Sequence, residues 1–250
     1  MVKGIDVSEW QGSIDWKKVA ASGVQVAIIR YADGSYIDRY FFQNMAGAIK
    51  AGLHVGAYIF SRATNEMQAR EEAQRLIKAC EPYAYDMPLY IDLEADSQKH
   101  IANKIAKAFI NECKIRKVKG GIYANLNWFN NYLDPTPYIN DPLWLAQYNN
   151  KITYKDPNIF GMWQYSSSGR VPGISGNVDL DYCYINYWKD TSQNESTSNV
   201  DKKIDEVSAS LAEKAKGVLA GKYGAGAARE KALGEYYQPV QFILNKVLED

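Results

Sequence analysis

Short apolar segments alternate with amphipathic segments through the first half of the chain. The apolar segments have the length of buried strands, and the segments between them repeat apolar residues at helical spacing. The predicted strands are 3–7, 24–31, 53–60, 89–93 and 120–123, and the predicted helices are 16–21, 41–51, 66–79 and about 101–115. This βαβα alternation indicates five strand–helix units around a parallel sheet.

The pattern changes after Asn125. Three short strand-like segments follow at 143–147, 160–165 and 178–180, joined by stretches rich in Pro, Gly, Asn and Ser without a clear helical repeat. The predicted fold class is therefore α/β: a modified (β/α) barrel of five βα units plus three strands. A barrel of this size is ordinarily one domain.

A polar segment separates this barrel from the C-terminal part of the chain. Residues 189–199 contain no apolar side chain, whereas apolar residues recur at helical spacing from Ile204 onward and glycines interrupt them at 221 and 224–226. We predict a catalytic barrel over 1–188, a polar linker over 189–203 and a small all-α three-helix module over 204–250. So short a module buries little core of its own.

Two carboxyl groups close the central predicted strand. Asp92 and Glu94 are two residues apart, so in a strand their side chains share a face with Cα atoms roughly 6.6 Å apart. Glycoside hydrolysis uses such a pair, one group protonated and one ionised. The alternative is a solvated strand end or a salt-bridge partner. The ends of the first and last predicted strands bring Asp6, Asp179 and Asp181 to the same rim, which favours catalysis.

The composition of the chain narrows the classes of partner that we expect it to bind. Lys plus Arg and Asp plus Glu both number 29, so overall charge gives no reason to expect nucleic acid or an anionic membrane as partner. Aromatic residues make up 13% of the chain, and their flat faces suit sugar rings as well as cores. No segment reaches transmembrane length and no secretory signal is visible, so we expect synthesis in the cytoplasm and action outside only after release.

Thiol, metal and cofactor chemistry find little support in the sequence. The three cysteines are scattered without CxxC spacing, and neither of the two histidines has a His or Cys at ligand spacing. We therefore expect buried thiols, no zinc and no cofactor. A carboxylate site for Mg²⁺ or Ca²⁺ at Asp6, Asp92, Glu94 and Asp179 is an alternative that would make the chain a metal-dependent hydrolase.

Residues 2 to about 188 resemble the lysozymes of glycoside hydrolase family 25, which include many phage endolysins. The segments that carry the resemblance are Gly4-Ile5-Asp6-Val7-Ser8, Trp10-Gln11-Gly12, Ile14-Asp15-Trp16, Gly56-Ala57-Tyr58, Asp92-Leu93-Glu94, Gly121-Ile122-Tyr123, Leu143-Trp144-Leu145-Ala146, Trp163-Gln164-Tyr165 and Gly176-Asn177-Val178-Asp179. The resemblance implies a muramidase that cleaves the β-1,4 bond between N-acetylmuramic acid and N-acetylglucosamine in bacterial peptidoglycan.

The same resemblance implies roles for individual residues. Glu94 takes the place of the general acid and Asp92 that of its partner carboxylate, with Asp6 and Asp179 on the two further acidic positions. Asp92 could act as nucleophile, stabilise the transition state or orient the acetamido group of the substrate. The expected sugar-binding residues are Tyr58, Tyr123, Trp163, Arg30, Tyr90, Gln164 and Asp181. For Tyr90, filling of the barrel is an equal alternative.

The C-terminal segment resembles the short cell-wall-binding repeat of some phage lysozymes, through motifs that include Val218 to Gly224, Arg229 and Val240-Gln241. Tyr223 and Arg229 are the expected wall contacts, although a packed Tyr and a solvated Arg are the simpler interpretation. The module could instead form a homo-oligomer. For the whole chain, a non-catalytic wall-binding lectin and a glucosaminidase on the same barrel are the remaining alternatives.

Overall fold

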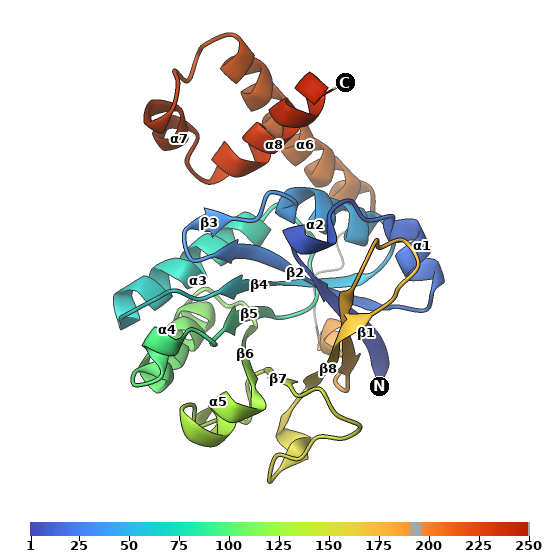
Figure 1. Ribbon diagram of the computed structural model, residues 1–250, viewed down its shortest axis with the longest axis vertical. Helices are drawn as coiled ribbons and strands as arrows, with labels where there is room; N and C mark the ends of the chain where they lie inside the picture. The colour runs from blue at the N-terminus through green and yellow to red at the C-terminus, as the bar shows by residue number, and fades with distance from the viewer. Residues whose placement is uncertain (191–196, 250) are drawn as a thin grey trace.

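A closed barrel forms the larger part of the molecule, and a helical module lies against one side of it (Figure 1). The computed structural model describes residues 1–190 and 197–249. The barrel strands are β1 (Val2–Val7), β2 (Val26–Asp33), β4 (His54–Phe60), β5 (Leu89–Asp92), β6 (Gly120–Asn125), β7 (Leu143–Ala146), β8 (Met162–Gly169) and β9 (Val178–Cys183). Their order is β1-β9-β8-β7-β6-β5-β4-β2, and pairing of β1 with β2 closes the sheet.

The five predicted strand–helix units and the three helix-poor strands are confirmed. The barrel helices are α1 (Trp16–Ala21), α2 (Phe41–Lys50), α3 (Glu66–Cys80), α4 (Ala102–Ile115) and α5 (Leu126–Asn131). The last of these has only six residues, and its N-terminus is capped by Asn125, whose side chain accepts a hydrogen bond from the backbone of Trp128. A two-residue strand, β3 (Tyr36–Ile37), pairs antiparallel with the last two residues of β2.

One strand runs against the direction that a parallel barrel predicts. Strand β9 pairs antiparallel with both β1 and β8, while the other strands of the closed barrel pair in parallel. No helix carries the chain back between β8 and β9, so the chain returns through the loop after Gly169 and enters β9 from the opposite end. As a result, the first residues of β9 lie at the rim where the other strands end.

Two apolar layers hold the barrel together. Val26, Ile28, Tyr90 and Trp144 belong to the cluster that fills its interior. The alternate residues, such as Ala27 and Ile29, pack outward under the helices. Side chains that point inward at the rim therefore stand on a filled core, which fixes their positions.

The C-terminal module consists of α6 (Thr197–Leu219), α7 (Ala227–Leu233) and α8 (Tyr237–Glu249). The predicted linker was 189–203. Residues 191–196 lie outside the described ranges, but residues 197–203 form the first turns of α6, the helix that buries Ile204 and Leu211. Within the described part of the chain, no helix is long and apolar enough to cross a membrane.

Candidate active site

Four carboxyl groups predicted from the sequence gather at one rim of the barrel. Asp6 lies near the end of β1, Asp92 ends β5, and Glu94 follows two residues later. Asp179, the second residue of β9, pairs directly with Asp6 because β9 is antiparallel to β1. The convergence predicted for a parallel barrel therefore occurs, but through the reversed direction of the last strand.

Asp92 and Glu94 differ in depth. Asp92 is only 5% exposed and Glu94 is half-buried, while the fully buried Leu93 between them points the other way. Burial raises the pKa of both carboxyl groups. The charge of Glu94 raises the pKa of Asp92 further, against a smaller lowering by Arg30 and Arg62. The two groups therefore resist being ionised together, so the pair retains a proton to higher pH than either would in water.

Asn125 holds the side chain of Glu94. Its Nδ2 donates a hydrogen bond of 2.5 Å to Glu94 Oε1, and this bond lowers the pKa of Glu94 against the rise caused by burial. The two residues line an open cavity of about 370 Å³, together with Asn127, Gln147 and Tyr148. Glu94 thus faces a space that a ligand can enter, whereas Asp92 lies deeper.

Asp6 is held by a separate hydrogen-bond network. Gln164 Nε2 donates to Asp6 Oδ2 at 2.7 Å, and the hydroxyl groups of Tyr123 and Tyr148 donate to Gln164 Oε1 at 2.9 and 3.1 Å. Burial, and after it the charges of Asp181 and Asp179, raise the pKa of Asp6. Through Gln164, this network links the Asp6 carboxyl group to the hydroxyl groups of Tyr123 and Tyr148 at the rim.

The predicted sugar-binding residues divide into three groups. Tyr58 and Tyr123 lie on the inner face near the acids, with their rings against Trp144. Gln164 and Asp181 are buried and bonded to other side chains of the site. Arg30 also points inward, but its guanidinium is occupied by Asp38 and Glu9 at 3.0 and 3.2 Å.

Two predicted sugar contacts, Tyr90 and Trp163, are not supported by their positions. Tyr90 is fully buried and fills the barrel beneath Trp144, so the barrel-filling alternative describes it. Trp163 precedes the inward-facing Gln164 on β8. Because neighbouring side chains on a strand alternate, its ring lies on the outer face beside Tyr165 and Tyr182. The prediction for Tyr90 gave its face but not its depth in the barrel, and the prediction for Trp163 gave neither.

Sequence reasoning missed three residues of the site. Asn125 and Tyr148 lie at or just after the ends of β6 and β7 and were not among the predicted site residues, and Trp144 was named only as part of a family motif. In the structure Asn125 bonds Glu94, Tyr148 bonds Gln164 and Trp144 bonds Asp181. Strand-end position was the available signal for the first two, whereas the reach of the Trp144 indole across the barrel had none.

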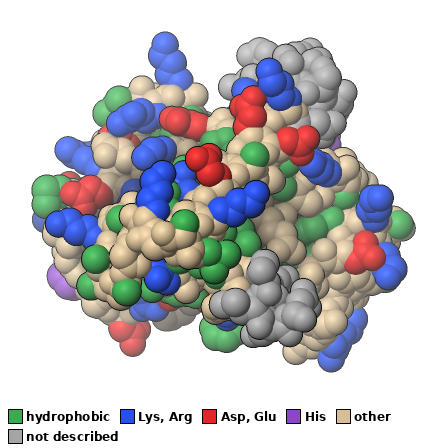
Figure 2. Space-filling model, turned by 90° about the horizontal axis from the view of Figure 1, so that it is seen from above, with side chains coloured by type: hydrophobic (Ala, Val, Ile, Leu, Met, Phe, Trp, Pro, Cys, Tyr) green, Lys and Arg blue, Asp and Glu red, His purple; other side chains and the backbone are tan. Residues whose placement is uncertain are grey.

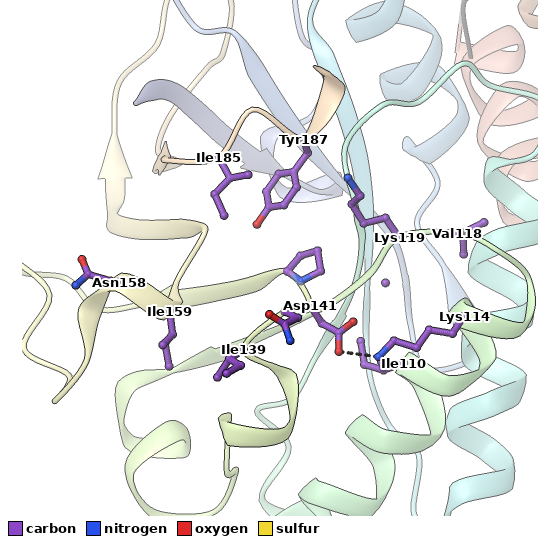
Figure 3. A pocket seen from close by; sticks show the side chains of 13 residues that line it. Ile110, Lys114, Val118, Lys119, Ile139, Asp141, Asn158, Ile159, Ile185 and Tyr187 are labelled. Atoms are coloured by element: carbon purple, nitrogen blue, oxygen red, sulfur yellow. Dashed lines mark hydrogen bonds and ion pairs between the residues drawn. The ribbon is translucent and has the colours of Figure 1, made fainter. Parts of the chain in front are cut away.

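A second pocket lies at the opposite end of the barrel, where β6 and β7 begin (Figure 3). It measures about 330 Å³, and its walls include Lys114, which pairs with Asp141 at 2.9 Å. None of the predicted site residues lines it. Among the described residues, no three His, Cys, Asp or Glu side chains are grouped so that they could hold a metal ion.

Comparison with known proteins places this geometry in a family. The model of Glycosyl hydrolases family 25 matches residues 5–174, and the model of the CW_7 repeat matches residues 213–248. The autolytic lysozyme of Clostridium acetobutylicum is 33% identical over 185 residues, which cover 72% of this chain and 55% of the relative. Lysozyme M1 of Streptomyces globisporus is 30% identical over 195 residues, covering 71% and 66%.

Solved structures of an endolysin and of a family 25 glycosyl hydrolase also resemble this chain. The CTP1L endolysin aligns with a TM-score of 0.66 at 28% identity over 76% of this chain and 70% of that chain. A family 25 glycosyl hydrolase from Bacillus anthracis aligns with a TM-score of 0.64 at 26% identity over 74% and 90%. The chain spans only 55% of the length of the Clostridium relative. The match of the family model over most of the barrel shows that the chain belongs to glycosyl hydrolases family 25.

Proposed function

We propose that this protein is a lysozyme that hydrolyses the β-1,4 bond between N-acetylmuramic acid and N-acetylglucosamine in bacterial peptidoglycan. Two of its relatives carry the name lysozyme, and one solved structure similar to it is an endolysin. The observation that carries the proposal is the Asp92–Glu94 pair. Burial raises the pKa of both carboxyl groups, the charge of Glu94 raises that of Asp92 further, and Glu94 lines an open cavity at the rim.

The chemistry follows from the different positions of the two groups. Glu94 faces the cavity and can give its proton to the glycosidic oxygen as the bond to the leaving sugar breaks. The deeper Asp92 then carries the negative charge that meets the positive charge developing at the anomeric carbon. The negative charge of Asp179 at the same rim raises the pKa of Glu94, which helps to keep the proton on Glu94 until it is transferred.

The C-terminal module is proposed to hold the enzyme on the wall, as its match to the CW_7 repeat suggests. Tethering raises the local concentration of the barrel at its substrate without adding contacts at the site. Tyr223 and Arg229 have partners inside the module: the Tyr223 ring packs against Gly217, and Arg229 donates to the Gly224 carbonyl and to Gln241 Oε1. This arrangement favours a structural role for both over direct wall contact.

Action on the wall requires release of the enzyme from the cell that makes it, and we propose that the protein works in this endolysin manner. Dimerisation through the module stays an alternative. Its rings Tyr236 and Phe242 pack on Phe42 and Tyr40 of the same chain, which leaves less apolar surface for a second copy.

The test is to digest purified peptidoglycan, reduce the new ends with borohydride and identify the sugar alcohol by mass spectrometry. We expect muramitol ends from the wild type and none from Glu94→Gln, because the amide cannot give the proton. The matched control is Glu71→Gln on the exposed side of α3, which should cleave like the wild type. Cosedimentation with cell walls should be equal for all three proteins.

Each other outcome points to one alternative. Glucosaminitol ends would indicate a glucosaminidase. Loss of cleavage in EDTA would indicate a metal-dependent hydrolase. Wall binding without new ends from any variant would leave a lectin. Full activity of Glu94→Gln would remove Glu94 from the role of acid.

A further inference from the structure

Asp181 is the most deeply buried acid of the site. It is two residues beyond Asp179 on β9, so both side chains point to the barrel interior, and Asp181 is 1% exposed. The indole Nε1 of Trp144 donates to Asp181 Oδ1 at 2.8 Å. The other carboxyl oxygen, Oδ2, is buried without a hydrogen bond from any described donor. A buried oxygen that only accepts hydrogen bonds is costly when no donor faces it.

The group beside Asp181 is a second carboxyl, that of Asp6. In the antiparallel pair of β1 and β9, Asp6 lies opposite Asp179 and diagonal to Asp181, and the carboxyl groups of Asp6 and Asp181 are within hydrogen-bonding reach. One oxygen of Asp6 already accepts from Gln164. Two ionised carboxylates cannot satisfy each other, since neither has a hydrogen to donate, but one proton between them satisfies both.

We propose that Asp6 and Asp181 share one proton in the barrel interior, and that Asp181 is thereby a positioning residue that holds Asp6 beneath the cleft. Asp181 does not touch substrate in this arrangement. Its effect on cleavage rests on the proposed lysozyme function, but the shared proton itself does not.

The surroundings of Asp181 support a retained proton. The titratable groups that interact electrostatically with it are Asp6 on β1, Tyr90 on β5, Tyr165 on β8, and Asp179 and Cys183 on β9. Within the described ranges, neither Asp6 nor Asp181 forms an ion pair with a Lys or Arg. Burial raises the pKa of Asp181 to about 8 against the lowering by its hydrogen bonds. The pair should therefore carry one negative charge at neutral pH and two only above this range.

The substitution Asp181→Asn removes the shared proton but keeps the hydrogen bonds of residue 181 to Trp144 and Asp6. The amide oxygen can still accept from Trp144, and the amide nitrogen can donate to an ionised Asp6. The variant pair then carries the same single negative charge as the wild type at neutral pH, without a shared proton. Asp181→Leu has a similar volume but offers Asp6 no donor.

Infrared spectroscopy of the full-length protein tests the shared proton directly. The C=O stretch of protonated carboxyl groups should be weaker at neutral pH in Asp181→Asn than in the wild type, and weaker by the same amount in Asp6→Asn. Asp96→Asn, which replaces an exposed acid paired with Lys99, should leave the band unchanged. If Asp6→Asn loses the band but Asp181→Asn keeps it, the proton belongs to Asp6 alone and the proposal fails. A band unchanged in both variants also overturns it.

Cleavage gives the second readout. Above pH 8 the wild-type pair gains a second charge, so log kcat/KM should fall more steeply with pH than it does for Asp181→Asn. Asp181→Leu should lose about tenfold or more in kcat with little change in KM, because Asp6 loses a charge-assisted hydrogen bond. Parallel pH profiles in wild type and Asp181→Asn would show a merely structural role. Inactivity of the wild type as well as of every variant, with the infrared result intact, would contradict the lysozyme function and not the shared proton.

Discussion

At the scale of single residues, Asn125 sets both the position and the acidity of Glu94. Replacement by Asp keeps the oxygen that caps α5 but puts a carboxylate where an amide donor stood. Loss of the donor and the added charge both disfavour ionised Glu94, so the pKa of Glu94 rises. If Glu94 is the acid, the fall of kcat/KM on the alkaline side moves to higher pH in Asn125→Asp. The maximal rate drops about tenfold, because Glu94 is less well oriented and gives up its proton less readily.

The control for this variant is Asn127→Asp. Asn127 lines the same cavity and is exposed, and its partner is Asn131 on α5. It adds the same charge in water without replacing a donor to Glu94, so screening should leave the pH profile nearly unchanged. Equal shifts in the two variants would mean that general charge, and not the Asn125 contact, controls the proton.

The same scale shows what the sequence could predict. Asp6, Asp92, Glu94 and Asp179 were predicted because a strand end and a two-residue spacing place a side chain at the rim and on a given face. Trp163 was predicted as a sugar contact without assigning β8 a face, and the inward position of Gln164 places the Trp163 ring on the outer face. The hydrogen bond from Trp144 to Asp181 joins strands far apart in the chain, and no local pattern encodes it.

At the scale of elements, five strand–helix units could be predicted because apolar runs of strand length alternate with segments that repeat apolar residues about every 3.6 positions. The direction of β9 could not, since a short apolar strand between loops has the same pattern whether it runs parallel or antiparallel. If β9 ran parallel to the other strands, its last residues would lie at the rim. Because β9 runs antiparallel, Asp179 near its start lies there instead, so the site depends on the strand whose direction is least predictable.

The short 3-10 helix η1 (Glu9–Gln11) offers a prediction at this scale. Glu9 connects it to the β2–β3 region by accepting from Arg30 at 3.2 Å, Tyr36 at 3.0 Å and Arg39 at 2.8 Å. Glu9→Gln removes the charge and leaves Arg30, which is largely buried, with Asp38 alone. We expect the free energy of unfolding in urea to fall by about 2 kcal/mol. The matched change Asp15→Asn breaks an exposed pair with Lys18 and keeps a good helix cap, so it should change little.

A fall no larger for Glu9→Gln than for Asp15→Asn would mean that solvent replaces the Glu9 contacts. The barrel strands alone, without the Glu9 contacts, would then determine the structure of the rim. A larger fall would show that η1 is tied to β2 and β3 by charge, and KM for peptidoglycan should rise with it because η1 follows directly on the strand of Asp6.

At the scale of the whole molecule, the module lies against the α2 side of the barrel (Figure 1). Tyr40 meets Phe242 at 4.5 Å and Phe42 stacks on Tyr236 at 6.0 Å, while Lys50 pairs with Asp205 on the surface at 2.9 Å. Cavities of about 460 and 390 Å³ remain between the two parts. On the face seen from above, charges of both signs are interspersed (Figure 2). Surface ion pairs and voids contribute little stability, so docking should be weak.

Weak docking leads to a prediction for the chain truncated after Trp188. Every strand that closes the barrel ends by Cys183, so the truncated protein should fold and cleave soluble glycan fragments at the wild-type rate. Its melting temperature should fall slightly because Phe42 becomes exposed, and Phe42→Ser in the truncated chain should reduce aggregation. Pelleting with cell walls should weaken, since the CW_7 match at 213–248 is removed. Tyr236→Ala in the full chain is the control: it loosens docking but keeps the module, so it should pellet normally. An unfolded truncated chain would make the module part of the barrel core, and unchanged pelleting would place wall binding on the barrel itself.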